Sequence, residues 1–197
     1  MEKARLEAFS DGVFAIVITL LILDIRIPDV DYAHLSSALV IVLPRIIAYV
    51  ISFFIIGVYW ISHHNSMAPI QKVDRGFLWL NILLLLCVSF IPFPTSLLGR
   101  YPYKALPIMI YGANLILCNG IGFMMLLYVK KHPEFLVKNF RPDIFRKQIP
   151  VYMLVNSLYL LGIILAPFYP IVSYVIYTLV VFGLITLVHK WLDRKII

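Results

Sequence analysis

The sequence predicts an all-α integral membrane protein with six transmembrane helices in one domain, residues 1–197. Two observations support this prediction. The chain is 62% hydrophobic and 14% charged, with a mean hydropathy of +0.94, outside the usual range of soluble domains. Its apolar stretches also have the length, about 20 residues, that a helix needs to cross a hydrocarbon core of ~30 Å.

Six stretches are long enough to span or nearly span a bilayer, and polar or turn-forming residues separate them. The predicted helices are 10–27, 38–61, 77–99, 105–129, 149–168 and 170–191. The first ends in Leu23-Asp24-Ile25-Arg26, which lacks the small residues of a signal-peptide cleavage site, so we expect it to be retained. The last two form a tight hairpin around Ala166-Pro167-Phe168-Tyr169-Pro170. Cys87 and Cys118 lie in apolar runs, where a thiol acts as a small hydrophobe.

The basic residues orient these helices, because cytoplasmic loops carry the positive excess. Of the 17 Lys and Arg residues, 13 fall on one side of the predicted membrane. They are Lys3, Arg5, Lys72, Arg75, Lys130, Lys131, Lys138, Arg141, Arg146, Lys147, Lys190, Arg194 and Lys195. We therefore expect both termini to be cytoplasmic. The basic residues are not interleaved with aromatic ones on a soluble module, so no nucleic-acid partner is expected.

The first helix carries charged and polar residues at its start and an apolar stripe beyond them. Ser10 or Asp11 could simply cap the exposed amides of the helix. Ile16, Leu20 and Leu23 have the spacing i, i+4, i+7, which places them on one face, with Thr19 beside it. Such a stripe suits ordinary helix packing, lipid contact or a pore lining, and the residues alone do not decide between these roles.

Several short patterns occur in order along the first three predicted helices. Arg5 precedes Phe9-Ser10-Asp11, Trp60 and His63 end the second helix, Trp79 and Asn81 open the third, and Pro92-Phe93-Pro94-Thr95 comes near its end. This ordered set resembles the endosomal and lysosomal potassium channel family, transmembrane protein 175, and its prokaryotic relatives. The last three helices resemble that family in topology only.

The resemblance implies a potassium-favouring cation channel, not an enzyme, with no cofactor beyond the permeating potassium ions. It implies a homotetramer in a prokaryotic plasma membrane, with the first helices around a central pore and no carbonyl filter loop. The narrowest hydrophobic ring would be Ile16, followed by rings of Leu20 and Leu23, and Thr19 would contact partly dehydrated ions. Ala15 stands where other members carry a small hydroxyl residue, so selectivity assigned to that hydroxyl does not transfer to this chain.

Polar groups inside a bilayer usually need partners in the bundle interior. We predict one hydrogen-bonded network that holds the first helix against the second and third. Its members are Arg5, Ser10, Asp11, Trp60, His63 and Asn81. The alternative is a set of separate interfacial groups in contact with water and lipid headgroups.

Three further predictions concern polar and basic residues outside this network. Arg45 either snorkels to the outer boundary or pairs with a carboxylate such as Asp24. No metal site is expected at His63-His64, because adjacent histidines point to different sides of a helix and no carboxylate or thiol completes the ligand set. The basic segment from Lys130 to Lys147 suits anionic lipid headgroups.

Two other functional classes remain as alternatives. A secondary transporter would need repeats or helix breaks at the bilayer midplane, for which Gly112 and Gly120 in the fourth helix leave room. A membrane enzyme would use His63 or His64 as acid or base, but it would also need a nucleophile, a metal or paired carboxylates at the same depth.

Overall fold

The computed structural model describes residues 3–193 of the chain, with side chains described as far as Leu184. Within residues 3–193 the helices are α1 (Lys3–Leu20), α2 (Leu35–Met67), α3 (Arg75–Phe90), α4 (Pro92–Arg100), α5 (Ala105–Lys131), α6 (Asp143–Leu165) and α7 (Pro170–Asp193). Short 3₁₀ turns η1 (Leu21–Asp24), η2 (Tyr32–His34) and η3 (Pro133–Phe135) lie between them. The predicted all-α class is confirmed. Arg194, Lys195 and the side chain of Lys190, used above for topology, lie outside the described residues.

The described helices have the length and apolarity of membrane spans. Five helical segments qualify, namely Lys3–Asp24, Tyr32–Met67, Arg75–Arg100, Ala105–Lys131 and Asp143–Leu165, and Pro170–Leu184 is a shorter apolar helix. The molecule is therefore a multi-pass membrane protein.

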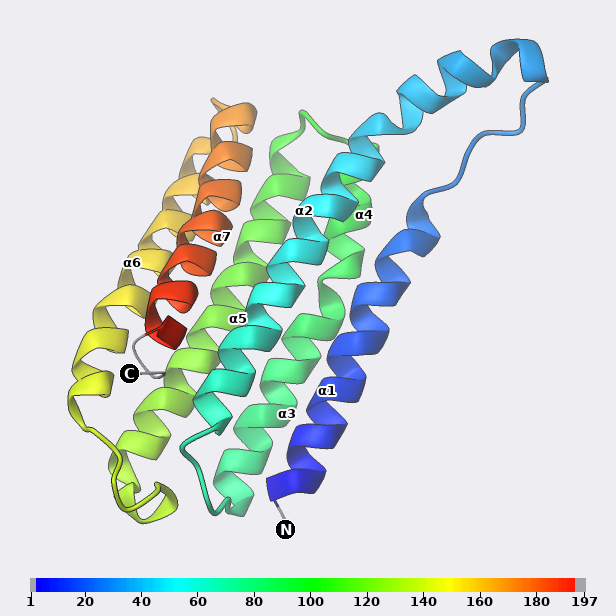
Figure 1. Ribbon diagram of the computed structural model, residues 1–197. Helices are drawn as coiled ribbons and strands as arrows, with labels where there is room; N and C mark the ends of the chain where they lie inside the picture. The colour runs from blue at the N-terminus through cyan, green and yellow to red at the C-terminus, as the bar shows by residue number, and fades with distance from the viewer. Residues whose placement is uncertain (1–2, 194–197) are drawn as a thin grey trace.

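The helices stand side by side as an elongated bundle (Figure 1). Helix α5 has the most neighbours and packs against α3, α4, α6 and α7. Helix α1 lies at one edge, where it packs against α2 and α3, while α6 and α7 form the opposite edge (Figure 1). One flank of α1 is consequently left without a covering helix.

The first predicted helix boundary is wrong at its start by seven residues. Helix α1 begins at Lys3 instead of residue 10, because a helix continues beyond its apolar part where charged side chains can reach water, and Lys3 pairs with Glu7 at 3.3 Å. Ser10 and Asp11 thus lie inside the helix, which removes their alternative role as helix caps. The regular helix ends at Leu20, and the turn η1 carries the chain to Asp24.

The third predicted span is two helices joined at Ile91. Pro92 has no backbone N–H to donate to the carbonyl of Val88, so the helix is interrupted and α4 starts at the proline. Helix α2 has an internal proline, Pro44, and is longer than predicted at both ends. Its first turns and the preceding segment project beyond the other helices (Figure 1).

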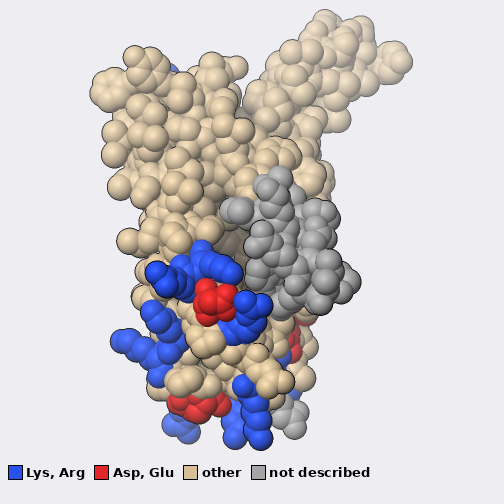
Figure 2. All heavy atoms as spheres, turned by 60° about the vertical axis from the view of Figure 1, so that its left-hand side comes forward, with Lys and Arg blue, Asp and Glu red and all other residues tan. Residues whose placement is uncertain are grey.

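One end of the bundle carries the N-terminus and the loops α2–α3 and α5–α6 (Figure 1). The two loops are joined by an antiparallel bridge between Ile70 and Leu136. Asp74 caps α3 by accepting from the Phe77 N–H at 2.8 Å, and it also accepts from the Tyr128 hydroxyl at 2.6 Å. Basic side chains gather towards this end on the face seen in Figure 2. We call it the basic end, and the opposite end the outer end.

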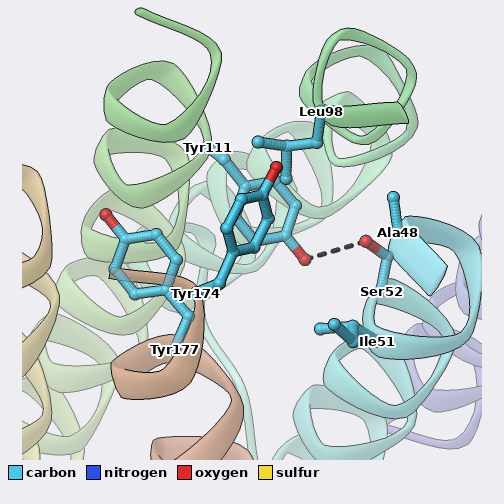
Figure 3. A pocket seen from close by; sticks show the side chains of 7 residues that line it. All are labelled: Ala48, Ile51, Ser52, Leu98, Tyr111, Tyr174 and Tyr177. Atoms are coloured by element: carbon cyan, nitrogen blue, oxygen red, sulfur yellow. Dashed lines mark hydrogen bonds between the residues drawn. The ribbon is translucent and has the colours of Figure 1, made fainter. Parts of the chain in front are cut away.

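Buried hydroxyl groups connect α2, α4 and α5 in the interior. The Ser52 hydroxyl lies 2.8 Å from the hydroxyls of Thr95 and Tyr111. Beside them is a cavity of about 10 Å³, lined mainly by apolar atoms and by the rings of Tyr174 and Tyr177 (Figure 3). A void this small holds one water molecule at most, so it is a packing feature of the bundle.

Candidate functional site

Helix α1 has two faces with different surroundings. Its buried residues are Leu6, Ser10, Phe14 and Val17, whose spacing of three to four residues forms a continuous stripe. This stripe packs on α2 and α3. The Phe14 ring, for example, lies 5.7 Å from the imidazole of His63 on α2.

The other face of α1 is apolar but uncovered within the subunit. Ile16 is 59% exposed, Leu20 46% and Leu23 62%. None of the three side chains is covered by α2 or α3, although Leu20 and Leu23 also border a pocket at the end of α1. An apolar face of this kind is expected to contact either lipid or a second copy of the chain.

Thr19 lies on the same exposed part of α1. Its hydroxyl hydrogen is directed to the backbone, with the carbonyls of Ile16 and Ala15 at 2.8 and 3.1 Å. A hydroxyl that donates to its own helix keeps its oxygen lone pairs available on the side that faces away from the helix. Thr19 can therefore present an acceptor oxygen and no donor to a group in front of α1.

A buried hydrogen-bonded chain connects α1, α3 and α2. The Asn81 side-chain amide donates to the Ser10 hydroxyl at 3.0 Å, and its carbonyl oxygen lies 2.7 Å from His63 Nε2. Ser10 in turn donates to the Leu6 carbonyl at 2.8 Å. Ser10 and Asn81 are inaccessible to solvent. Because Asn81 supplies both a donor and an acceptor, it fixes α1 and α2 to α3 simultaneously.

Asp11 and Trp60 form a second, separate contact between α1 and α2. The Trp60 indole N–H donates to Asp11 Oδ1 at 2.8 Å, on the surface of the subunit. The next histidine along α2, His64, lies with its ring 6.0 Å from that of Trp60, whereas the His63 ring is buried against Phe14. The adjacent histidines thus occupy different environments.

The structure departs from the single network inferred from sequence. It brings Ser10, Asn81 and His63 together in one group and Asp11 with Trp60 in another. Arg5 and Phe9 are exposed and join neither group among the described residues. An exposed guanidinium at the bilayer surface is hydrated, which explains why Arg5 needs no partner inside the subunit.

A third polar group lies at the outer end of α1 and excludes one of the two alternatives for Arg45, the pair with Asp24. Asp24 pairs with Arg100 at 3.5 Å and accepts from the Ser96 hydroxyl at 2.8 Å. Arg45 instead donates to the backbone carbonyl of Arg26 at 3.2 Å. The suggested Arg45–Asp24 pair is therefore not formed. Ser96 and Arg100 were missed because nothing in the sequence indicates that α4 ends beside η1.

The fold and these contacts define a class: a multi-pass helical membrane protein whose first helix is anchored on one face and uncovered on the other. A family model for the endosomal/lysosomal potassium channel TMEM175 matches residues 5–92, which contain α2, α3 and all but the first two residues of α1. A potassium channel of Chryseobacterium sp. (strain P1-3) is 35% identical over 184 residues, 91% of either chain. The chain belongs to the TMEM175 potassium channel family.

Other relatives agree with this assignment. A potassium channel of Streptomyces collinus is 48% identical over 101 residues, a match that spans 51% of this chain and 49% of the relative. The crystal structure of a lysosomal potassium-selective channel TMEM175 homolog from Chamaesiphon minutus superposes with a TM-score of 0.82 at 29% identity, covering 94% of this chain and 97% of that one. The similarity in structure extends over the whole bundle, including the last three helices.

Proposed function

We propose that residues 1–197 form one channel domain that assembles as a homotetramer and conducts potassium ions along an axis lined by α1. The observation that carries this proposal is the division of α1 into an anchored face and an uncovered apolar face with Ile16 and Leu20, which Leu23 of η1 continues. The names of the bacterial relatives support potassium as the permeating ion. No cofactor is needed for passive conduction.

Rings of Ile16, Leu20 and Leu23 from several copies would act as a hydrophobic gate. A narrow apolar constriction expels water and blocks ions, and it conducts when the helices rotate or spread. The gate thus depends on pore radius. Ile16 is the proposed main barrier, with the other two residues as further rings towards the outer end.

Thr19 would supply the polar contact in this pore. Because its hydroxyl hydrogen is directed to the backbone, the oxygen lone pairs can face a cation that has lost part of its hydration shell. The contact favours cations over anions, since the side chain offers an acceptor and keeps its donor engaged.

The polar contacts behind α1 would be structural. Asn81, Ser10 and His63 are buried between helices and have one another as partners, so they are unsuited to bind a passing ion. Their proposed role is to keep α1 in one rotation about its own axis. Since the gate residues lie on the opposite side of the helix, that rotation determines which side chains meet at the axis.

The proposed location is a prokaryotic plasma membrane with both termini in the cytoplasm. The positive-inside tendency favours this orientation, because basic side chains gather at the basic end (Figure 2) and the connection between α5 and α6, with the basic segment from Lys130 to Lys147, lies there (Figure 1). The secondary-transporter alternative receives no support from α5, which is one continuous helix through Gly112 and Gly120.

Potassium flux from liposomes and single-channel currents test the proposal. We expect the purified wild-type protein to dissipate a potassium gradient without a coupled substrate, and Ile16→Asn to increase conductance or leak by wetting the constriction. Leu154→Asn on α6 is the matched control, because Leu154 is as exposed as Ile16, 59%, but lies away from α1. Equal currents from wild type and Ile16→Asn, or an equal change in both variants, would contradict the gate.

A further inference from the structure

The outer end of the subunit contains a second, larger cavity of about 400 Å³ beside the end of α1. Three helical segments form it: η1 with the residues around it, the first half of α2, and α4. Its charged and hydroxyl groups are Asp24, Arg26, Arg45, Ser96 and Arg100. We call it the outer pocket.

The outer pocket has an excess of positive charge. Asp24 is its only carboxylate and is engaged by Arg100 and Ser96. Among the described residues, no carboxylate lies within ion-pair distance of Arg26 or Arg45. Two guanidinium groups in the same pocket are therefore left without a carboxylate partner, which makes the pocket electropositive and suited to an anion.

Arg45 is held in place and retains free donors. Its backbone and Cβ lie directly against Gly99 of α4, where a Cβ on residue 99 would come within 2.9 Å of the Arg45 Cα. One terminal nitrogen donates to the Arg26 carbonyl. A guanidinium has five N–H groups, so most of them remain available. A fixed arginine of this kind suits bidentate binding of an oxyanion.

The walls of the pocket also contain exposed apolar side chains. Phe93 of α4 is 53% exposed and lines the same cavity as the arginines, together with the neighbouring Pro92. An apolar wall next to two unpaired guanidiniums resembles the boundary between acyl chains and headgroups, where the ligand available in a bilayer is a phospholipid.

We infer that the outer pocket binds a phosphate oxyanion between Arg26 and Arg45, supplied by an outer-leaflet phospholipid or by free phosphate. The bound phosphate supplies the missing negative charge. A second consequence rests on the proposed function. Leu20 and Leu23 border the same cavity, so the bound phosphate would also reduce the repulsion between the two arginines and cations near the outer end of α1.

Native mass spectrometry of the purified full-length protein tests the inference independently of conduction. The protein is mixed with phosphatidylglycerol or with phosphatidylcholine, and the bound lipids per subunit are counted. We expect a tightly retained phosphatidylglycerol in the wild type and an affinity about tenfold lower in Arg26→Gln, since a charge-assisted hydrogen bond to the phosphate is lost. Arg26 suits the test because its structural contact uses the backbone carbonyl, which the substitution keeps.

Two further variants make the result specific. Arg45→Lys keeps the charge without the planar fork and should bind with intermediate affinity. Arg146→Gln removes an exposed charge at the basic end and should leave binding unchanged. Equal binding by wild type and Arg26→Gln, or an equal loss in Arg146→Gln, overturns the inference.

A phosphorus NMR titration with inorganic phosphate distinguishes the two sources. Saturable line broadening that Arg26→Gln abolishes, without a preference for phosphatidylglycerol, assigns the site to free phosphate, whereas lipid retention that phosphate does not displace assigns it to the headgroup. Absence of both overturns the site. A protein that binds lipid through Arg26 but conducts no potassium contradicts the channel proposal and leaves the pocket intact.

Discussion

Replacing Asn81 with leucine removes the side chain that joins α1, α2 and α3. Leucine is similar in size, so the main cost is the loss of two buried hydrogen bonds. His63 Nε2 would lose its partner in a nearly buried position, which costs about 1–3 kcal/mol. Ser10 keeps its bond to the Leu6 carbonyl. Losing the Asn81–Ser10 hydrogen bond therefore costs only the ~0.6 kcal/mol average for polar contacts between membrane helices. The free energy of unfolding should fall by about 1.6–3.6 kcal/mol, the sum of the two contributions.

Reversible unfolding in mixed micelles, or steric trapping in bicelles, measures this change. Asn156→Leu is the matched control, because the buried Asn156 Oδ1 has no hydrogen-bond partner among the described residues. That substitution should cost nothing. The double variant His63→Phe with Asn81→Leu should lose at least ~1 kcal/mol less than the two single losses combined. A stable Asn81→Leu protein, or single losses that simply add, would refute the reasoning.

Two further predictions concern packing and charge. Gly162→Ala should lower the free energy of unfolding by about 1–3 kcal/mol, because the new methyl group overlaps the buried Tyr177 ring. Gly120→Ala, with nothing within 4 Å of its Cβ, should be neutral or stabilising in the same unfolding measurement. The reverse order of stability would contradict the packing. The pKa of Asp74 lies below its ordinary value because the Phe77 N–H and the Tyr128 hydroxyl donate to the carboxylate. This stability is present above the ordinary aspartate pKa and is lost as pH falls through the lowered one, so in Asp74→Asn the unfolding midpoint should depend less on pH in the acid range below the ordinary aspartate pKa; an unchanged acid dependence would contradict it.

The membrane class was predictable from sequence because long apolar runs have few stable alternatives to spanning helices. The start of α1 was not, since hydrophobicity ends near Asp11 while the hydrogen-bonded helix continues through Arg5 to Lys3. The helix break before Pro92 could have been predicted from sequence, because a proline inside a helical run removes a backbone hydrogen-bond donor.

The side-chain partners were only partly predictable. The polar residues near the basic end were recognisable because buried polar groups in a membrane need partners. Which residue bonds to which depends on helix rotation, and Ser10 and Asn81 are 71 positions apart in the chain. The outer pocket depends in the same way on α4, whose end beside η1 brings Ser96 and Arg100 to Asp24.

The uncovered face of α1 is the feature on which the functional account rests. A structure of the assembled protein in lipid nanodiscs is the most direct measurement of its surroundings. The account predicts four copies around a pore lined by α1, with the narrowest point of the pore at Ile16 and with Leu20 and Leu23 nearer the outer end. Ile16 against lipid, with another helix at the symmetry axis, would contradict it.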